Sequence, residues 1–210
     1  MKRLIFSLLF ISGTFCSFAQ RMEELFIKMP EGIVIQLEEA WRKDLVDLYK
    51  SGKAATLENM MQGRSTLLKL TDNYLLLQST ECSTVEMKLL PLVNNTYIIC
   101  MITTVSAPVA DSRVDFYTTD WSILPTGELY TPVTADRFLK DDIDHSSIAF
   151  SDANALLDIF LVKYSLDADN NTLTAEYTTP LYLDEESRRK VVPVLKDVPK
   201  IYEWKLSRFE

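Results

Sequence analysis

The spacing of apolar residues changes once along this chain, and this change constrains the fold more than any other feature of the sequence. Between Pro30 and Gly52 apolar side chains recur every three or four residues, whereas after residue 66 they alternate with polar ones. The first spacing is typical of an amphipathic helix, and the second of a strand with one buried face. The sequence therefore predicts an α+β fold, in which an N-terminal amphipathic helix packs on an antiparallel sheet.

The predicted helix has one apolar stripe and one polar face. The stripe consists of Val34, Leu37, Trp41, Leu45 and Leu48, and the positions outside it are Glu38, Glu39, Arg42, Lys43 and Asp47. Side chains three and four residues apart share one side of a helix, so the first set is expected to face the sheet and the second to face solvent. A shorter helix is expected at residues 54–61.

Turn residues divide the alternating segment into an antiparallel meander. The pairs Asp72-Asn73 and Asn94-Asn95 each lie between two alternating runs. Asparagine and aspartate tolerate the left-handed backbone of tight turns, so both pairs predict two-residue hairpin loops. Strands are expected at residues 65–71, 74–80, 87–93, 96–105 and 113–123.

The composition of the chain changes again after residue 124. Residues 125–147 are rich in Pro, Thr, Gly and Asp and are predicted to form a loop or linker. A smaller β-rich portion is expected at residues 148–210, with a hairpin at 156–166 and 172–179, a helix at 185–190 and a strand at 202–206. The chain then divides into a helix and sheet at residues 20–124, the linker and the C-terminal portion, or forms one continuous domain over 20–210.

The N-terminus has the pattern of an export signal. Lys2 and Arg3 precede an apolar run, and the small residues Ser17 and Ala19 suit a cleavage site after Ala19. The apolar run is shorter than the roughly 20 residues that span a bilayer, and no later segment reaches that length. Residues 1–19 are therefore predicted to be a signal peptide, which would place the mature chain in a periplasm or outside the cell.

Removing that segment makes an acidic chain more acidic. It contains two of the 22 Lys and Arg and none of the 30 Asp and Glu, so the formal net charge moves from −8 to −10. No run of basic residues offsets this charge, and nucleic acid and anionic lipid are therefore not expected as partners. The 47% hydrophobic content predicts a folded core rather than disorder.

Two cysteines, Cys82 and Cys100, remain after the predicted cleavage. With Asn94-Asn95 as a two-residue loop, Cys100 would lie opposite Leu89 in the core, and Cys82 would point to the other face of the sheet. A disulfide needs Cα atoms about 4.4–6.8 Å apart, which this register does not allow. We expect two buried free thiols; a bulge in the strand would permit a bridge, and a metal site lacks a nearby histidine.

The only histidine lies in an acidic segment that could carry chemistry. Asp141, Asp142, Asp144 and His145 could hold a cation, or Asp144 could orient His145 toward a neighbouring serine. Catalytic partners usually come from distant segments, so a solvated acidic loop is the better interpretation.

Other short motifs match known sites only in part. The segment from Asp167 begins like a calcium loop, but Thr172 replaces the required glycine and Thr178 the bidentate glutamate. A polar hairpin turn explains it better. The sequence therefore assigns no metal, no cofactor and no catalytic residue.

Aromatic residues near the end of the meander form one candidate binding face. Tyr117 and Trp121 should lie on one side of the strand with Ile123, and Phe116 on the other side with Val114. Exposed rings on a rigid strand would make a platform for a sugar or a protein, although such rings more often belong to the core.

Several phrases of the sequence are shared with a known family. They are "FIKMPEGIVIQLEEAWRKDLVDLY", "LLKLTDNYLLLQST", "STVEMKLLPLVNNTYIICMITTV" and "RVDFYTTDW". They resemble an uncharacterised family of exported Bacteroidales proteins, classified as a domain of unknown function, most strongly over residues 26–121. The resemblance implies a Gram-negative envelope or secreted protein and brings no functional residues with it.

Taken together, these features predict an exported, non-enzymatic protein that binds a protein or a glycan at the cell envelope. The alternative is a small hydrolase of envelope or dietary polymers, with two carboxylates as acid and base. A deep pocket with two close carboxylates would favour the hydrolase, and an exposed apolar patch would favour the binding protein.

Overall fold

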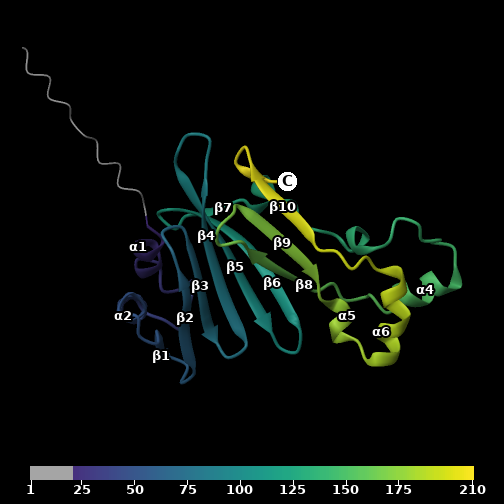
Figure 1. The fold of residues 1–210 in the computed structure, drawn as a ribbon, viewed down its shortest axis with the longest axis horizontal. Helices are drawn as coiled ribbons and strands as arrows, with labels where there is room; N and C mark the ends of the chain where they lie inside the picture. The colour runs from purple at the N-terminus through teal and green to yellow at the C-terminus, as the bar shows by residue number, and fades with distance from the viewer. Residues whose placement is uncertain (1–20) are drawn as a thin grey trace, which may run out of the picture.

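The computed structural model describes residues 21–210, so the predicted signal peptide lies outside the described residues. The N-terminal half contains α1 (Met22–Ile27), α2 (Glu39–Lys50), β1 (Thr56–Glu58), β2 (Arg64–Leu70), β3 (Tyr74–Thr80), β4 (Ser83–Pro91), β5 (Tyr97–Ser106), β6 (Ala110–Thr118) and β7 (Ile123–Leu124). The C-terminal half contains α3 (Thr126–Leu129), the 3-10 helix η1 (Ala135–Phe138), α4 (Ile148–Ala155), β8 (Val162–Leu166), β9 (Thr172–Tyr177), α5 (Thr179–Tyr182), α6 (Glu185–Val191), the 3-10 helix η2 (Val192–Val194), β10 (Lys200–Lys205) and β11 (Arg208–Phe209) (Figure 1).

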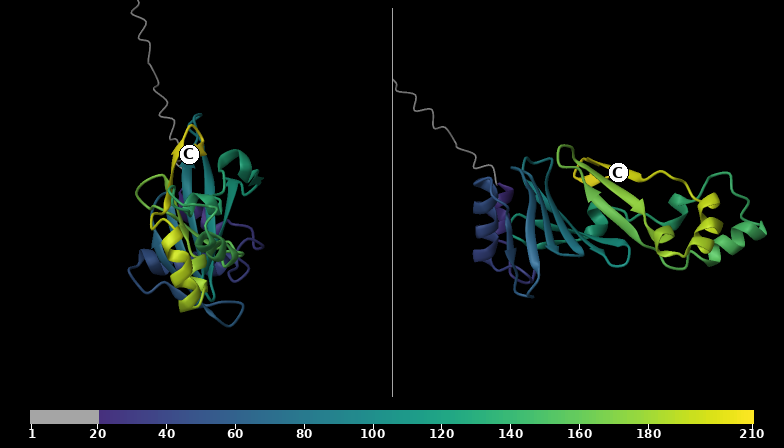
Figure 2. Two further views of the ribbon diagram at one scale, coloured as in Figure 1. Left: turned by 90° about the vertical axis from the view of Figure 1, so that its right-hand side faces the viewer. Right: turned by 60° about the horizontal axis from the view of Figure 1, so that its bottom comes forward.

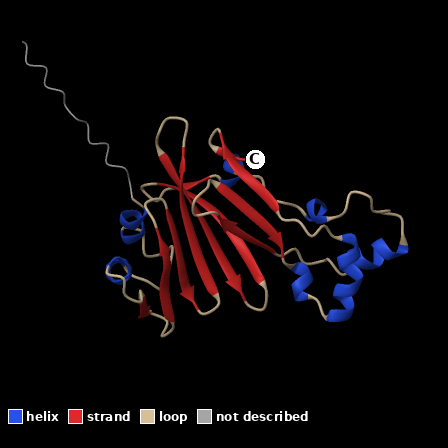
Figure 3. Ribbon diagram, in the orientation of Figure 1, coloured by secondary structure: helices blue, strands red, loops and turns tan. Residues whose placement is uncertain are grey.

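The elements form successive layers along an elongated molecule (Figure 2). Strands β1 to β7 make one antiparallel sheet in sequence order, and β8 to β11 make a second antiparallel sheet. Helices α1 and α2 cover one face of the large sheet, the small sheet covers the other, and short helices gather beyond the small sheet (Figure 3). The predicted mixture of helices with a large antiparallel sheet is confirmed.

The helix-side core follows from the alternation of side chains along the strands. Leu75 and Leu77 of β3, Met87 of β4 and Met101 of β5 point to the same face and meet Leu45 of α2. Because strand side chains alternate, the remaining positions of β4 and β5 face the small sheet, and most of them are buried as well. The two buried faces explain why β4 is nearly continuously buried from Val85 to Leu90.

The structure differs from the sequence prediction at the start of α2. The helix begins at Glu39, and residues 31–36 form turns. Arg42, which we expected in solvent, is 1% exposed. Its guanidinium donates hydrogen bonds to the carbonyl oxygens of Ile27, Met29 and Leu37, which lie on the segment that enters the helix. These carbonyls satisfy a charge that would otherwise be costly to bury.

A second core joins the two sheets. It contains Phe116 from the large sheet and Tyr164 and Tyr202 from the small sheet, so both halves of the chain build it. Residues 125–147, predicted as a loop or linker, add Tyr130, Val133 and Phe138 to this core. The segment is therefore packed between the sheets over part of its length, although α3 and η1 are its only helical turns.

The loop between β4 and β5 corrects the predicted register by one residue. The Leu92 N–H bonds the Thr96 carbonyl, which leaves three loop residues, and Asn95 has a φ of 62°. Leu89 therefore pairs with Ile99, and Cys100 pairs with Lys88. Cys100 is buried between the sheets, and burial raises the pKa of its thiol. By contrast, the two-residue loop at Asp72-Asn73 is confirmed by the Thr71 N–H bond to the Tyr74 carbonyl.

Three further expectations were wrong. Cys82 is an exposed free thiol in the turn between β3 and β4, because β3 ends at Thr80 and β4 begins at Ser83. Residues 54–61 contain β1 rather than a helix, because Thr56–Glu58 pair with β2. Residues 156–161 do not extend the hairpin, since α4 ends at Ala155 and β8 begins at Val162.

Candidate functional site

The residues of the predicted acidic loop lie at the surface. Asp141, Asp142, Asp144 and His145 are all exposed, and His145 packs edge-on against Phe150. Asp144 accepts hydrogen bonds from the Ser146 N–H and hydroxyl, which lower its pKa. In the part of the chain that the structure describes, no group of three or more His, Cys, Asp or Glu residues is placed to hold a metal ion.

The predicted aromatic face belongs to the helix side of the large sheet. Tyr117 is 9% exposed and Trp121 is half-buried, with ring centroids 5.6 Å apart. Both pack on the helix-side core, while Phe116 and Val114 face the small sheet, as the alternation predicted for residues 114–117. The predicted continuous strand at 113–123 is wrong, because β6 ends at Thr118, Trp121 lies in the loop before β7, and Ile123 is 73% exposed. An exposed platform would need Tyr117 in solvent, and the structure places it in the core.

A hollow lies at the opposite end of the molecule, between β9, α5 and the chain that leads into β10. We call it the C-terminal groove; its volume is about 530 Å³. Its apolar walls are formed by Phe138, Pro180, Leu181, Val192, Leu195 and Val198. Its polar residues include Glu176, Lys196 and Asp197. A concave, mainly apolar hollow of this size with a few polar groups is the usual form of a binding site.

Aromatic rings make a rigid base beneath the groove. Phe138 stacks on Tyr177 with centroids 5.0 Å apart, and Phe160 lies 5.4 Å from the same tyrosine ring. Burial raises the pKa of Tyr177, whose hydroxyl is enclosed and has no hydrogen-bond partner among residues 21–210. The walls above this base are open, because Leu181, Val192 and Val198 are 59%, 54% and 68% exposed.

The groove exists because one chain segment changes its pairing partner. Leu195 forms an antiparallel bridge with Leu139, and the Lys196 N–H bonds the Phe138 carbonyl. From Lys200 onward the chain pairs instead with β9, starting opposite Ala175. Residues 197–199 cross from one partner to the other, are not paired with β9, and line the hollow together with the end of β9.

This crossing leaves the main chain of Tyr177 without a partner on the β10 side of β9, whereas on the other side Tyr177 lies opposite Val162 of β8. The Trp204 N–H bonds the Asn171 carbonyl, and hydrogen-bonded pairs recur at every second residue of an antiparallel ladder. Leu173 and Ala175 are therefore the β9 positions whose main-chain groups point to β10 and bond to it. Tyr177 is the next such position, and Val198 does not pair with it. The Thr178 N–H bonds the Leu161 carbonyl, so Tyr177 is a non-hydrogen-bonded position of the ladder with β8. Among the main-chain hydrogen bonds of residues 21–210 that lie outside the strand ladders, none uses the N–H or carbonyl of Tyr177.

The charges around the groove leave an acidic excess. Lys196 pairs with Asp141 at 2.7 Å, and Lys163 pairs with Glu176 at 3.4 Å. The hydrogen bond from Lys196 lowers the pKa of Asp141. Asp197 is in none of the ion pairs found in residues 21–210, so it carries one uncompensated negative charge at the rim.

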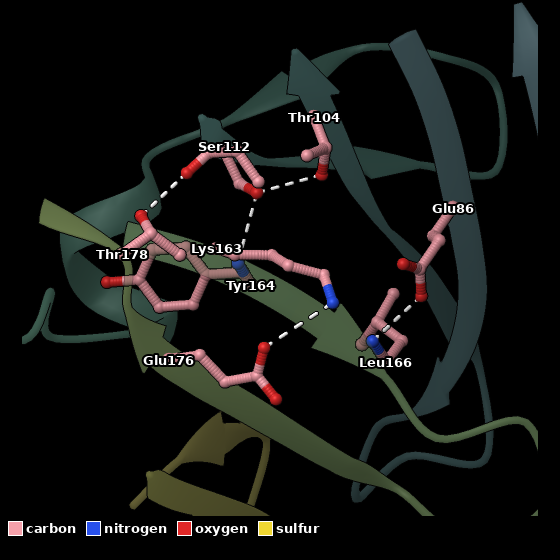
Figure 4. A network of polar contacts seen from close by, with 9 residues as sticks. Glu86, Thr104, Ser112, Lys163, Tyr164, Leu166, Glu176 and Thr178 are labelled. Carbon is pink, nitrogen blue, oxygen red and sulfur yellow. Dashed lines mark hydrogen bonds and ion pairs between the residues drawn. The ribbon is translucent and has the colours of Figure 1, made fainter. Parts of the chain in front are cut away.

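A polar network holds the small sheet behind the groove in place (Figure 4). Strand β8 is the edge of its sheet, so alternate N–H groups have no strand partner. The N–H groups of Val162, Tyr164 and Leu166 donate to the side-chain oxygens of Asp111, Ser112 and Glu86 at 3.1, 3.0 and 2.9 Å. Side chains of the large sheet thus take the place of a missing strand.

Glu86 and Lys88 are two ionisable groups that this junction encloses. Glu86 also accepts from the Tyr74 hydroxyl at 3.1 Å, and Lys88 donates to the Ala168 carbonyl at 2.7 Å. Burial raises the pKa of Glu86 and lowers the pKa of Lys88. The Glu86 carboxyl lies between the sheets with its donors rather than at the groove.

Sequence reasoning did not find the groove residues. They come from four separate segments, and no one segment has a motif. The available signals were indirect: the apolar residues Leu181, Val192 and Val198 stand beside prolines in a short-helix region, and Pro199 interrupts the approach to a strand. Only Asp141 connects the predicted acidic loop to the groove, through Lys196.

This chain belongs to the family described as "Protein of unknown function (DUF3256)", whose model matches residues 14–209. The structure is similar to that of a domain of an uncharacterized protein from Porphyromonas gingivalis W83, with 31% sequence identity and a TM-score of 0.82 over 90% of this chain and 97% of that one. None of the curated proteins matches this chain.

The resemblance to a family of unknown function is thereby confirmed, and the similar structure comes from a member of the Bacteroidales. Residues 21–210 contain no helix with the length and apolar character needed to cross a membrane.

Proposed function

We propose that this protein is a non-enzymatic binding module whose partner docks in the C-terminal groove. The observation that carries the proposal is the exposure of Leu181, Val192 and Val198 around one concave surface. Exposing apolar side chains to water costs free energy, and a contiguous group around a hollow marks an interaction site.

The chemistry of the groove favours a protein partner over a glycan. Sugar sites need exposed aromatic faces with polar groups around them, whereas these walls are aliphatic side chains and prolines above partly covered rings. Such walls suit Leu, Ile or Val side chains of another polypeptide. The predicted export signal supports a partner in the cell envelope.

The hydrolase alternative finds less support. It requires an acid and a base facing one cleft, one of them with a raised pKa. Glu86 has such a pKa but is committed to the Tyr74 hydroxyl and the Leu166 N–H between the sheets. A carboxylate in this role holds the fold together rather than reaching a substrate.

Site-specific crosslinking in the native cell tests the proposal. A photoreactive phenylalanine analogue in place of Leu181 should capture one protein, and Val198→Asp in the same chain should remove that product. The matched control carries the analogue in place of Val93, which is 75% exposed on a distant loop. Identical products from positions 181 and 93, or none from 181, would contradict binding at the groove.

A further inference from the structure

We infer that the C-terminal groove binds an extended peptide segment that pairs with the main chain of Tyr177, inserts a large apolar side chain and carries a Lys or Arg beside Asp197. This inference rests on the proposed function and names the class of its partner. The inferred partner binds as an unfolded or strand-like segment, and not as a folded domain with a preformed surface.

The main chain of Tyr177 is the first argument. Its N–H and carbonyl occupy the next pairing position of β9 after Ala175, on the side from which β10 has departed. An extended residue placed opposite would exchange two hydrogen bonds with Tyr177, as in an antiparallel ladder. Binding by strand addition uses such an edge, with main-chain bonds for affinity and side-chain pockets for selection.

The side-chain walls are the second argument. Successive side chains of a segment paired with Tyr177 would point alternately to the two faces of the extended sheet. One of them would enter the hollow of about 530 Å³ between Leu181, Val192 and Val198. This volume holds a Leu, Ile or Phe side chain together with part of the adjoining backbone, and burying such a side chain contributes about 1.5–3 kcal/mol in general.

The charges at the rim are the third argument. Glu176 and Asp141 each have a lysine partner, whereas Asp197 has none among the described residues. The whole chain has a formal net charge of −8. A cationic side chain on the incoming segment would therefore complement Asp197, and an anionic one would be repelled.

A defined peptide tests all three arguments on the full chain. The probe is an acetylated, amidated octapeptide of sequence Lys-Thr-Leu-Thr-Leu-Thr-Leu-Lys, with a fluorescent label for anisotropy. Leu181→Asp is expected to weaken its binding at least tenfold, or about 1.4 kcal/mol. Val93→Asp is the matched control and should leave the affinity unchanged, and circular dichroism should show both variants folded.

Two further comparisons separate the main-chain and charge contributions. Methylating one backbone nitrogen of the peptide at a time should give one position that loses about tenfold in affinity while its two neighbours lose less than about threefold. A peptide in which glutamates replace the two lysines should bind the natural chain more weakly than the lysine peptide does. On the Asp197→Lys variant the order should be reversed, with the glutamate peptide binding more tightly.

The outcomes distinguish this inference from the proposed function. If no peptide binds below about 1 mM while the crosslink from position 181 persists, the partner docks as a folded surface and the inference is wrong. A uniform response to backbone methylation would also overturn it. If both the peptide and the crosslink fail, the proposed function fails with it.

Discussion

The two ends of this molecule treat their apolar side chains in opposite ways. At the helix-covered end Leu37 and Leu45 are 1% and 0% exposed, whereas at the C-terminal end Leu181 and Val198 are 59% and 68% exposed. Helix α2 has 12 residues and can lay a full stripe on the sheet, but α5 has four and covers little of its surroundings. Short helices that leave apolar residues in water are suited to binding rather than to stability.

Buried polar groups show the same division. At the helix end Arg42 is enclosed and satisfied by carbonyl oxygens of its own chain. At the C-terminal end the Tyr177 main-chain groups have no partner on the β10 side, and the Asp197 carboxylate is in none of the ion pairs found in residues 21–210. The guanidinium at the helix end is therefore satisfied internally, whereas the C-terminal end leaves main-chain groups, a carboxylate and apolar surface available.

The largest expected effect is at Arg42. Arg42→Ala should lower the free energy of unfolding by about 3–5 kcal/mol, because three carbonyl oxygens lose a charged donor in a buried place. Lys43→Ala, on the exposed side of the same helix, should change it by less than about 0.5 kcal/mol. Urea unfolding measures both; equal losses would show that the helix end is not held by this guanidinium.

Two leucines compare the ends directly. Leu45→Ala should cost about 2–5 kcal/mol, since it leaves a cavity in the helix-side core, while Leu181→Ala should cost less than about 0.5 kcal/mol. The same urea titrations give both values. A large loss at Leu181 would mean that the groove wall is part of the stabilising core, which would erase the contrast between the ends.

Glu86 tests the junction between the sheets. Glu86→Ala should cost about 2 kcal/mol, because the Leu166 N–H and the Tyr74 hydroxyl lose their acceptor. Ser165→Ala, on the same strand as Leu166 but on a half-buried position, is the control and should have a smaller effect.

The pH dependence of Glu86 has a definite sign. Burial raises its folded pKa above the ordinary value of 4.5, so between the two values the folded state binds the proton more tightly. This contribution to stability is full below pH 4.5 and is lost as the pH rises through the folded pKa. The Glu86→Gln variant lacks this pH-dependent contribution. The free energy of unfolding of the natural chain should therefore fall relative to that of the variant as the pH rises above 4.5. A constant difference would place Glu86 in solvent.

The smallest effects are expected in the β4–β5 and β6–β7 loops, which both have three residues with a left-handed conformation at the third. Asn95 and Trp121 both have positive φ, at 62° and 68°, a conformation that costs a side chain other than glycine or asparagine about 1–2 kcal/mol. Asn95→Gly should be nearly neutral. Trp121→Gly should lose about 1–2 kcal/mol, because the indole packs on the helix-side core and its loss exceeds the strain relieved. If Trp121→Gly is the more stable protein in thermal unfolding, the ring contributes little.

Local pattern accounts for the elements of this fold and not for the finer pairing. The alternation from residue 66 onward predicted the meander, and Asp72-Asn73 gave a correct hairpin. Asn94-Asn95 gave a register that was wrong by one, because asparagine suits both a two-residue loop and the left-handed third position of a three-residue loop. That single residue decides that Cys100 lies opposite Lys88.

Side-chain period and turn chemistry act over a few neighbouring residues, and they were enough to predict a mixture of helices with an antiparallel sheet. The burial of Arg42, the small sheet on the second face of the large one and the groove beside Tyr177 became visible only in the folded chain. These features depend on carbonyls, strands and walls that are distant in the sequence, and no local spacing records which of them meet.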